Sequence, residues 1–116
     1  LAGDDLDIYS GNDDQVIPIL SLGGIGVISV LSNVRPAAVH DMVMEYLNGN
    51  IKSALDIQLK YLDLIEALFC EVNPIPVKAA MKLLGYDVGG LRLPLTELED
   101  ANRARLKESM ESLKEN

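Results

Sequence analysis

Short apolar runs and glycine-rich turns alternate over the first 34 residues of the chain. Residues 7–10 (DIYS) predict a short strand, and a helix is expected from about residue 14 to residue 22. Residues 27–31 (VISVL) are rich in β-branched side chains, which is typical of a strand buried on both faces of a parallel sheet. Strand, helix and strand form a βαβ unit, whose two strands need further strands beside them.

The next part of the chain has the apolar spacing of helices. A helix is predicted from residue 36 to about residue 47, because Pro36 suits a first helical turn. After the break at residues 48–50, a longer helix is predicted from Ile51 to Glu71. Its apolar residues lie on two faces, so we expect packing on two sides. The faces are Leu55, Leu59, Leu62, Ile65 and Phe69, and Ile57, Tyr61, Leu64 and Leu68.

The last third of the chain predicts two further helices. Residues 73–76 (NPIP) interrupt the chain, and a short helix over residues 77–84 is closed by Gly85. A loop leads to the final helix, where Thr96 and Glu99 have the spacing of a capping box.

Composition and charge narrow the classes of partner. Hydrophobic residues make up 48% of the 116 residues, which is high for so small a unit, so we expect apolar surface to meet another chain or a missing part of the same chain. The net charge of −8 argues against nucleic acid and anionic membrane. No apolar run reaches the ~20 residues that span a bilayer. The chain begins with Leu1 instead of Met, so we expect a truncated or processed piece.

The sequence offers little for a metal or thiol site. Cys70 is the one cysteine, which excludes an internal disulfide, and its apolar surroundings favour a core thiol over a nucleophile. His40 is the one histidine, and one His with one Cys does not make a metal site. We expect no metal and no cofactor.

The strongest chemical candidate is the segment Ser10-Gly11-Asn12-Asp13, directly after the first strand. Ligands of parallel-sheet proteins bind beyond the carboxyl ends of the strands. A glycine there lets a substrate approach the backbone, and exposed amides can hold a carboxylate. An ordinary turn, with an Asp that caps the next helix, explains the same residues. The glycines at residues 23–26 precede a strand, so they indicate a tight turn and no nucleotide site.

No lysine ends either predicted strand, so the chain by itself contains no credible imine-forming site. All six lysines fall on or beside predicted helices: Lys52, Lys60, Lys78, Lys82, Lys107 and Lys114.

Four motifs in order resemble the dihydrodipicolinate synthase family, most of all its bacterial, clostridial-type members. They are YSGND at residues 9–13, GGIGVISV at 23–30, NPIPVK at 73–78 and LRLPL at 91–95. The resemblance implies an α/β fold, the C-terminal part of a (β/α)8 TIM barrel with an appended helical domain. Residues 1–48 would hold barrel strands seven and eight with their helices, and residues 49–116 the C-terminal helical domain.

The resemblance also implies a function, the condensation of pyruvate with aspartate-4-semialdehyde in lysine and diaminopimelate biosynthesis. The family's Schiff-base lysine and its proton-relaying tyrosine and threonines come from earlier strands, so this chain alone is expected to be inactive. Gly11, Asn12 and Asp13 match the loop on the semialdehyde side, with Asn12 where some members carry an acidic residue. Ile28 matches the strand-eight residue whose carbonyl faces the pyruvate imine while its side chain packs.

Further expectations follow from the family. They are a cytoplasmic homotetramer, or assembly with the missing N-terminal part, and an Arg92 that ties its loop to a carboxylate. Two other functions stay open. One is a related pyruvate aldolase such as N-acetylneuraminate lyase, whose members usually carry a Tyr-Asp-Glu type of turn at residues 11–13. The other is a non-catalytic, self-associating helical fragment.

Overall fold

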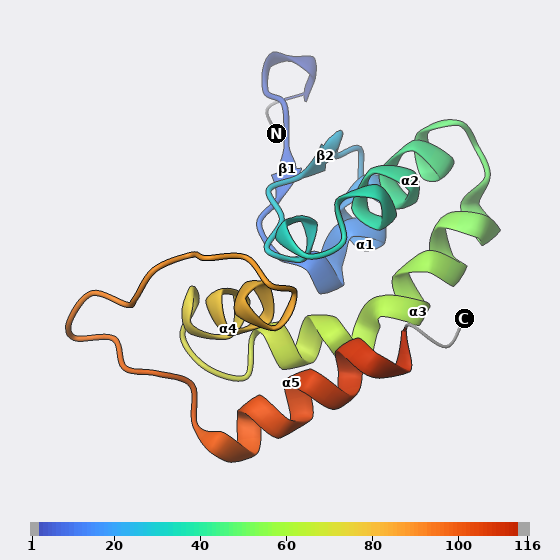
Figure 1. Cartoon of the computed structure of the whole chain (residues 1–116). Coiled ribbons are helices and arrows are strands. Elements are labelled where there is room, and N and C mark those ends of the chain that lie inside the picture. The colour runs from blue at the N-terminus through green and yellow to red at the C-terminus, as the bar shows by residue number, and fades with distance from the viewer. Residues whose placement is uncertain (1–2, 114–116) are drawn as a thin grey trace. The chain divides into compact units, whose positions relative to one another are not determined.

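The computed structural model describes residues 3–113 and divides into two compact units, Leu1–Lys60 and Tyr61–Asn116. The first unit contains two short strands, three 3-10 turns and two helices, and it ends inside a third (Figure 1). In chain order these are η1 (Gly3–Asp5), β1 (Tyr9–Ser10), η2 (Asp13–Gln15), α1 (Val16–Ser21), β2 (Gly26–Val27), η3 (Leu31–Asn33), α2 (Pro36–Leu47) and the first part of α3 (Ile51–Leu68).

The two strands confirm the predicted βαβ unit. β1 and β2 are parallel, with Tyr9 opposite Gly26 and Ser10 opposite Val27. The ladder continues for one hydrogen bond beyond β2, because the Ile28 amide donates to the Ser10 carbonyl at 2.8 Å. The strands therefore end side by side.

The strand predicted over residues 27–31 is too long. Only Gly26–Val27 is strand, Val30 has right-handed helical angles, and η3 starts at Leu31. The cause is a buried carboxylate: Asp13 accepts hydrogen bonds from the amides of Val30 and Leu31, both at 2.9 Å, and so turns the chain. The β-branched pattern alone could not predict this turn.

The glycine-rich turn before β2 is tight, as predicted. Gly23 has a φ of +96°, which favours glycine. At Gly24 an added Cβ would lie 2.5 Å from a side-chain methyl carbon of Ile19, while the Gly24 amide donates to the Ile19 carbonyl. The turn thus brings the chain back against α1.

Apolar side chains of α1 and α2 form the core of the first unit. Val16, Leu20 and Met42 are buried, and partly buried side chains pack against them: Ile17, Val27, Val43, Tyr46 and Ile57. Each of these two helices therefore has one apolar side that packs into this core. In α3, however, Leu55 and Leu59 of the first predicted face are exposed. Ile65 of the same face is buried, as are Leu64 and Leu68 of the other face. The expected packing on two sides is therefore found only in the later part of the helix. α3 also ends at Leu68 and not at Glu71.

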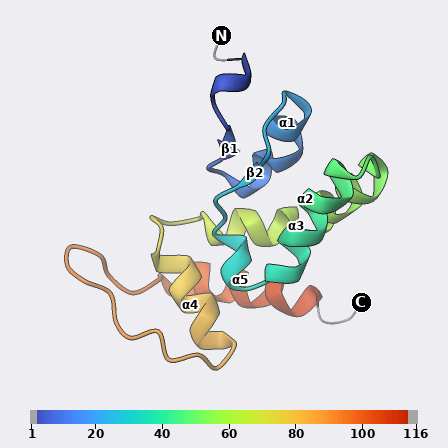
Figure 2. The same cartoon turned by 90° about the horizontal axis from the view of Figure 1, so that it is seen from above.

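The second unit contains the end of α3, then α4 (Ile75–Leu83) and α5 (Asp100–Ser112). Its buried residues include Leu64, Leu68, Ala80, Leu106 and Met110. Between α4 and α5 the chain runs as a wide loop without regular structure (Figure 2). The predicted domain boundary between residues 48 and 49 concerns the barrel of a longer protein and stays a prediction.

The start of α5 differs from the predicted capping box. The helix begins at Asp100 after Glu99, and no side chain caps it from within its own turn. Glu71 takes that role instead: one of its carboxylate oxygens accepts the Glu99 amide at 3.0 Å and the Asn102 side-chain amide at 2.7 Å. The acceptor for the backbone amide at the start of α5 therefore comes from a residue 28 positions earlier in the chain.

Candidate functional site

The loop after β1 presents its backbone to open space. Ser10 is buried, and its hydroxyl donates to the Asn12 carbonyl at 2.7 Å and accepts the Asn12 amide at 3.2 Å. Gly11 and Asn12 are exposed, and nothing lies within 4 Å of a Cβ built on Gly11. The Ser10 side chain thus fixes the loop, and the exposed side of Gly11 leaves room for a ligand.

Asp13 has a different environment, because only 1% of its surface is exposed. Its carboxylate accepts hydrogen bonds from the Ser29 hydroxyl and from the amides of Val30 and Leu31. The alternative in which the Asp13 side chain caps the following helix is wrong, since neither η2 nor α1 has a side-chain cap at its N-terminus. Asp13 instead joins the loop after β1 to the segment after β2.

Gln58 on α3 holds the same loop from its other side. Gln58 is only 5% exposed, and its side-chain amide nitrogen donates a hydrogen bond to the Asp13 carbonyl at 2.8 Å. Its amide oxygen accepts the Ile17 amide at 3.4 Å. Sequence reasoning missed both Gln58 and Ser29. A Gln within a helix usually faces solvent, and nothing local marks this one as buried.

Ile28 lies directly after β2, and its amide is used by the ladder with Ser10. The Ile28 side chain is 72% exposed in this chain, so its packing within a complete barrel stays a prediction. Within the described part of the chain β2 pairs only with β1, so no neighbouring element covers Ile28.

Three of the predicted site residues therefore lie in one loop, and hydrogen bonds connect that loop to the segment of the fourth. The carboxyl ends of parallel strands face one edge of a sheet, where ligands bind. Gly11 and Asn12 offer backbone and amide groups, and Ile28 offers a carbonyl. Such groups can orient a small polar substrate, but they include no nucleophile and no general base.

The lysines occupy other parts of the fold. Lys52, Lys82 and Lys107 each lie within 4 Å of a carboxylate, and the ammonium of Lys78 donates to the Gly90 carbonyl. Lys60 is on α3, and Lys114 lies outside the described residues. As predicted, no lysine lies on β1 or β2.

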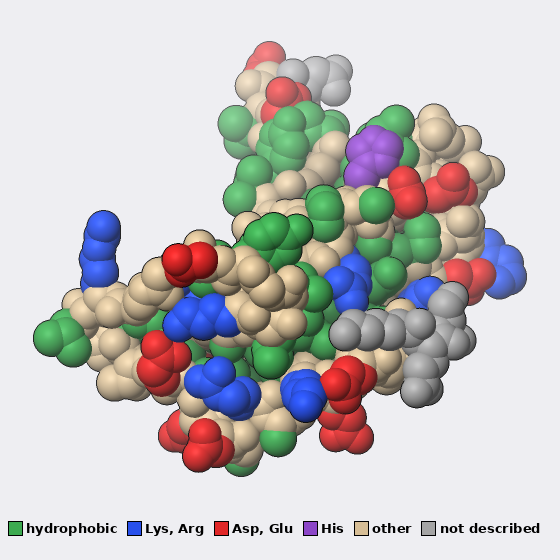
Figure 3. All heavy atoms as spheres, viewed as in Figure 1, with side chains coloured by type: hydrophobic (Ala, Val, Ile, Leu, Met, Phe, Trp, Pro, Cys, Tyr) green, Lys and Arg blue, Asp and Glu red, His purple; other side chains and the backbone are tan. Residues whose placement is uncertain are grey.

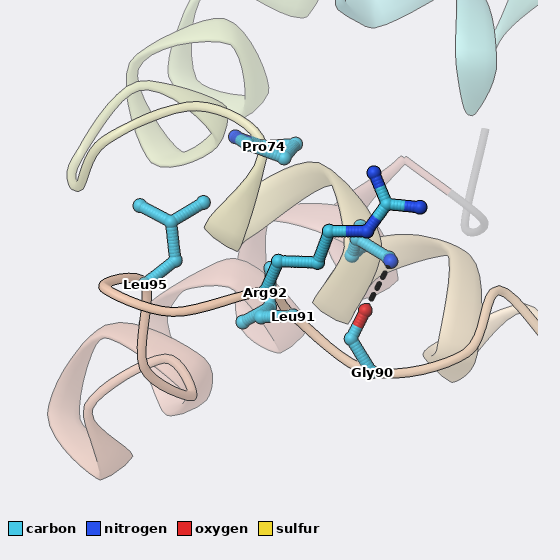
Figure 4. A pocket seen from close by; sticks show the side chains of 6 residues that line it. Pro74, Gly90, Leu91, Arg92 and Leu95 are labelled. Atoms are coloured by element: carbon cyan, nitrogen blue, oxygen red, sulfur yellow. Dashed lines mark hydrogen bonds between the residues drawn. The ribbon is translucent and has the colours of Figure 1, made fainter.

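A hollow of about 330 Å³ lies in the second unit beside the loop that follows α4. Figure 4 shows Arg92 extending from this loop, with its guanidinium group turned away from Leu95. Among residues 3–113, no carboxylate forms an ion pair with Arg92, so its tie to a carboxylate stays a prediction. The hollow is open and holds no acid–base pair.

Neither a thiol site nor a metal site emerges from the part of the chain that the structure describes. Cys70 is half-buried, and burial, followed by the negative charge of Glu71, raises the pKa of its thiol. A raised pKa makes the thiolate scarce, which disfavours a nucleophile. The predicted place of Cys70 in the core is not confirmed, because the residue is only half-buried. No group of three His, Cys, Asp or Glu residues within 3–113 could hold a metal ion.

The chain matches known proteins along nearly its whole length. The model of the Dihydrodipicolinate synthetase family matches residues 1–113. A 4-hydroxy-tetrahydrodipicolinate synthase from Clostridium tetani is 59% identical over 110 residues, which are 95% of this chain and 37% of that protein. The synthase from Lachnoclostridium phytofermentans is 56% identical over 108 residues, which are 93% of this chain and 37% of that protein.

Solved structures agree with these matches. A dihydrodipicolinate synthase from Thermotoga maritima has a TM-score of 0.92 at 40% identity, over 96% of this chain and 38% of that one. A synthase from Cyanidioschyzon merolae, solved with lysine bound, has a TM-score of 0.89 at 43% identity, over 93% of this chain and 37% of that one.

The fold class predicted from the sequence is therefore confirmed: a mostly helical chain with the structure of the C-terminal part of a (β/α)8 barrel enzyme. The chain belongs to the dihydrodipicolinate synthetase family. It spans little more than a third of the length of the relatives that it matches.

Proposed function

We propose that this chain is the substrate-wall and scaffold part of a lyase that condenses pyruvate with aspartate-4-semialdehyde in lysine biosynthesis. The observation that carries the proposal is the family match over residues 1–113, together with 59% identity to a 4-hydroxy-tetrahydrodipicolinate synthase. In the proposed enzyme, a lysine outside this chain forms the Schiff base with pyruvate. This chain then contributes no nucleophile.

The proposed roles of the wall residues follow from their chemistry. Gly11 leaves the backbone open, so a substrate can come close to the amides of the loop. Asn12 adds an exposed side-chain amide, which can both donate and accept a hydrogen bond. Ile28 contributes a carbonyl on the pyruvate side. Asp13 acts indirectly, since its carboxylate is already used by Ser29, Val30 and Leu31.

Exposed apolar groups around the two strands support assembly with further strands. Ile8, Tyr9, Ile25 and Ile28 are all exposed, and Figure 3 shows apolar side chains gathered around β1. Parallel sheets in proteins are almost always covered on both faces. We infer that barrel strands of a longer protein, or of a partner polypeptide, cover this surface.

A homotetramer and a cytoplasmic location belong to the same proposal. Within residues 3–113, the structure has no helix long and apolar enough to cross a membrane.

A chimaera provides the experiment. This chain replaces the matching 110 residues of the Clostridium tetani relative, and the product is tested for condensation and for imine formation with pyruvate under borohydride. We expect condensation, and an adduct on a lysine outside residues 1–116. Native mass spectrometry of the same sample tests the tetramer. An adduct on one of the lysines of this chain, or a folded chimaera without condensation, contradicts the proposal.

The same assay separates the related aldolase. A chimaera that cleaves N-acetylneuraminate in preference to condensing the semialdehyde would favour that function. The turn at residues 11–13 is Gly-Asn-Asp and not the Tyr-Asp-Glu type, so we expect no such cleavage.

A further inference from the structure

Asp13 is a junction that two separate elements hold by different atoms. Its carbonyl accepts the side-chain amide of Gln58 from α3, at 2.8 Å. Its carboxylate accepts three hydrogen bonds from the segment after β2, the donors being the Ser29 hydroxyl and the amides of Val30 and Leu31. One residue therefore links α3, the loop after β1 and the chain beyond β2.

The Gln58 side chain has little freedom at this junction. Its nitrogen donates to Asp13 while its oxygen accepts the Ile17 amide at 3.4 Å, so a flipped amide would set donor against donor and acceptor against acceptor. The residue is 95% removed from solvent, where an unpaired polar group is costly. The network therefore has one satisfied arrangement, and that arrangement fixes the main chain at Asp13.

The loop that this network fixes is the one with open space above it. Gly11 and Asn12 are exposed and are fastened on one side by Ser10 and on the other by Asp13. Without Gln58, the Asp13 carbonyl and the Ile17 amide lose these two hydrogen bonds, and the Asp13–Asp14 peptide at the end of the loop loses its anchor to α3. A wall displaced by a fraction of an ångström no longer orients a substrate.

We propose that Gln58 is a positioning residue for the aldehyde substrate and acts through the main chain of Asp13. The proposal rests on the proposed function, because it assigns Gly11 and Asn12 to the semialdehyde side. It predicts a selective effect: loosening the loop weakens use of aspartate-4-semialdehyde and leaves imine formation with pyruvate nearly unchanged, because the imine lysine belongs to another part of the enzyme.

The experiment uses the chimaera with the Clostridium tetani relative, and the substitution Gln58→Met, which keeps the length and removes both hydrogen bonds. We expect KM for the semialdehyde to rise about tenfold, while KM for pyruvate and borohydride trapping stay near those of the unsubstituted chimaera. The matched control is Gln15→Met, because Gln15 is exposed. It should change neither KM.

Two further variants keep the test decisive. Gln58→Glu keeps the size of the side chain and can still accept a hydrogen bond from the Ile17 amide. It places a carboxylate oxygen against the Asp13 carbonyl, however, so KM for the semialdehyde should be raised in this variant as in Gln58→Met. Ser29→Ala removes one of the three hydrogen bonds to the Asp13 carboxylate and should raise the same KM by a smaller factor. Should Gln58→Met fail to fold, Ser29→Ala carries the test.

The outcomes distinguish the two levels of the account. An active chimaera in which the Gln58 and Ser29 variants lower thermal stability but move both KM values equally, or neither, overturns the positioning role and leaves the proposed function standing. A folded but inactive unsubstituted chimaera overturns the proposed function, and the positioning role falls with it.

Discussion

The side-chain amide of Gln58 donates a 2.8 Å hydrogen bond to the main-chain carbonyl of Asp13, a residue 45 positions earlier in the chain. The contact is buried, and it joins a helix of the chain to the loop at the end of its first strand. A candidate substrate loop is thus held in place by a residue with no chemistry of its own. Substitutions in the chimaera can separate groups that hold the loop from groups that face the substrate.

Asp13→Asn should destabilise the fold by about 2 kcal/mol, because hydrogen bonds to a charged acceptor are worth about 1.5–3 kcal/mol and the new amide sets its own donors against those of the Ser29–Leu31 segment. The urea midpoint measures this loss. Asp14→Asn is the matched control, since Asp14 is exposed, and it should change stability by less than about 0.5 kcal/mol. Equal midpoints for the two variants would contradict the role given to Asp13.

Gly11→Ala should separate function from stability. Nothing lies within 4 Å of the added methyl group, so the urea midpoint should stay unchanged. The methyl group would occupy the space proposed for the semialdehyde, so KM for that substrate should rise about tenfold. Gly90→Ala, where the space is also open, is the control and should leave both quantities alone. An unchanged KM in Gly11→Ala would remove Gly11 from the site.

Gly24→Ala should lower stability by about 1–3 kcal/mol, since the added methyl group meets Ile19 at 2.5 Å in a packed turn. Thermal unfolding measures the loss. The double variant with Ile19→Ala should recover part of it, because the clashing carbon belongs to the Ile19 side chain. No recovery would indicate that the backbone contact with the Ile19 carbonyl dominates.

Glu71→Ala should cost about 1–2 kcal/mol, because the Glu99 amide at the start of α5 and the Asn102 side chain both lose their acceptor. Thr96→Ala should be nearly neutral, since Thr96 is exposed and α5 has no side-chain cap from its own turn. Urea titration compares the two. The opposite order of losses would restore the capping box that the sequence predicted.

Cys70 should be alkylated slowly near neutral pH. Burial and the charge of Glu71 raise the pKa of the thiol, and only the thiolate reacts. The folded pKa lies above the unfolded one, so the neutral thiol stabilises the fold at pH values below the unfolded pKa. That contribution is lost as pH rises through the folded pKa. The rate at which iodoacetamide labels Cys70, followed by mass spectrometry, should be higher in Glu71→Gln than in the control Glu111→Gln.

The sequence predicted the fold where periodicity carries the information. The βαβ order and the helix at residues 36–47 are both present in the structure. It failed where a distant partner decides the outcome. Asp13 ends the strand after Val27, and Glu71 caps α5, and both depend on contacts between residues 17 to 28 positions apart. Local patterns do not contain such contacts.

The candidate site was predictable only as a loop. Its place after a strand and its glycine favour a ligand, and the family resemblance gave the loop a role. Nothing in the sequence shows that Asp13 turns inward to Ser29 while Asn12 stays exposed, because both are polar residues in a turn. The burial of Gln58 could not be predicted for a related reason: whether a polar helix residue is buried depends on which groups the tertiary fold leaves without hydrogen-bond partners.

The role proposed for this chain is tested by the initial rate at which the unsubstituted chimaera condenses pyruvate with aspartate-4-semialdehyde. We expect a rate within about tenfold of the Clostridium tetani enzyme, a difference of no more than about 1.4 kcal/mol in the barrier. A folded chimaera, with a native circular dichroism spectrum and a cooperative melt, that does not catalyse the reaction would contradict the claim that these residues form the wall of that active site.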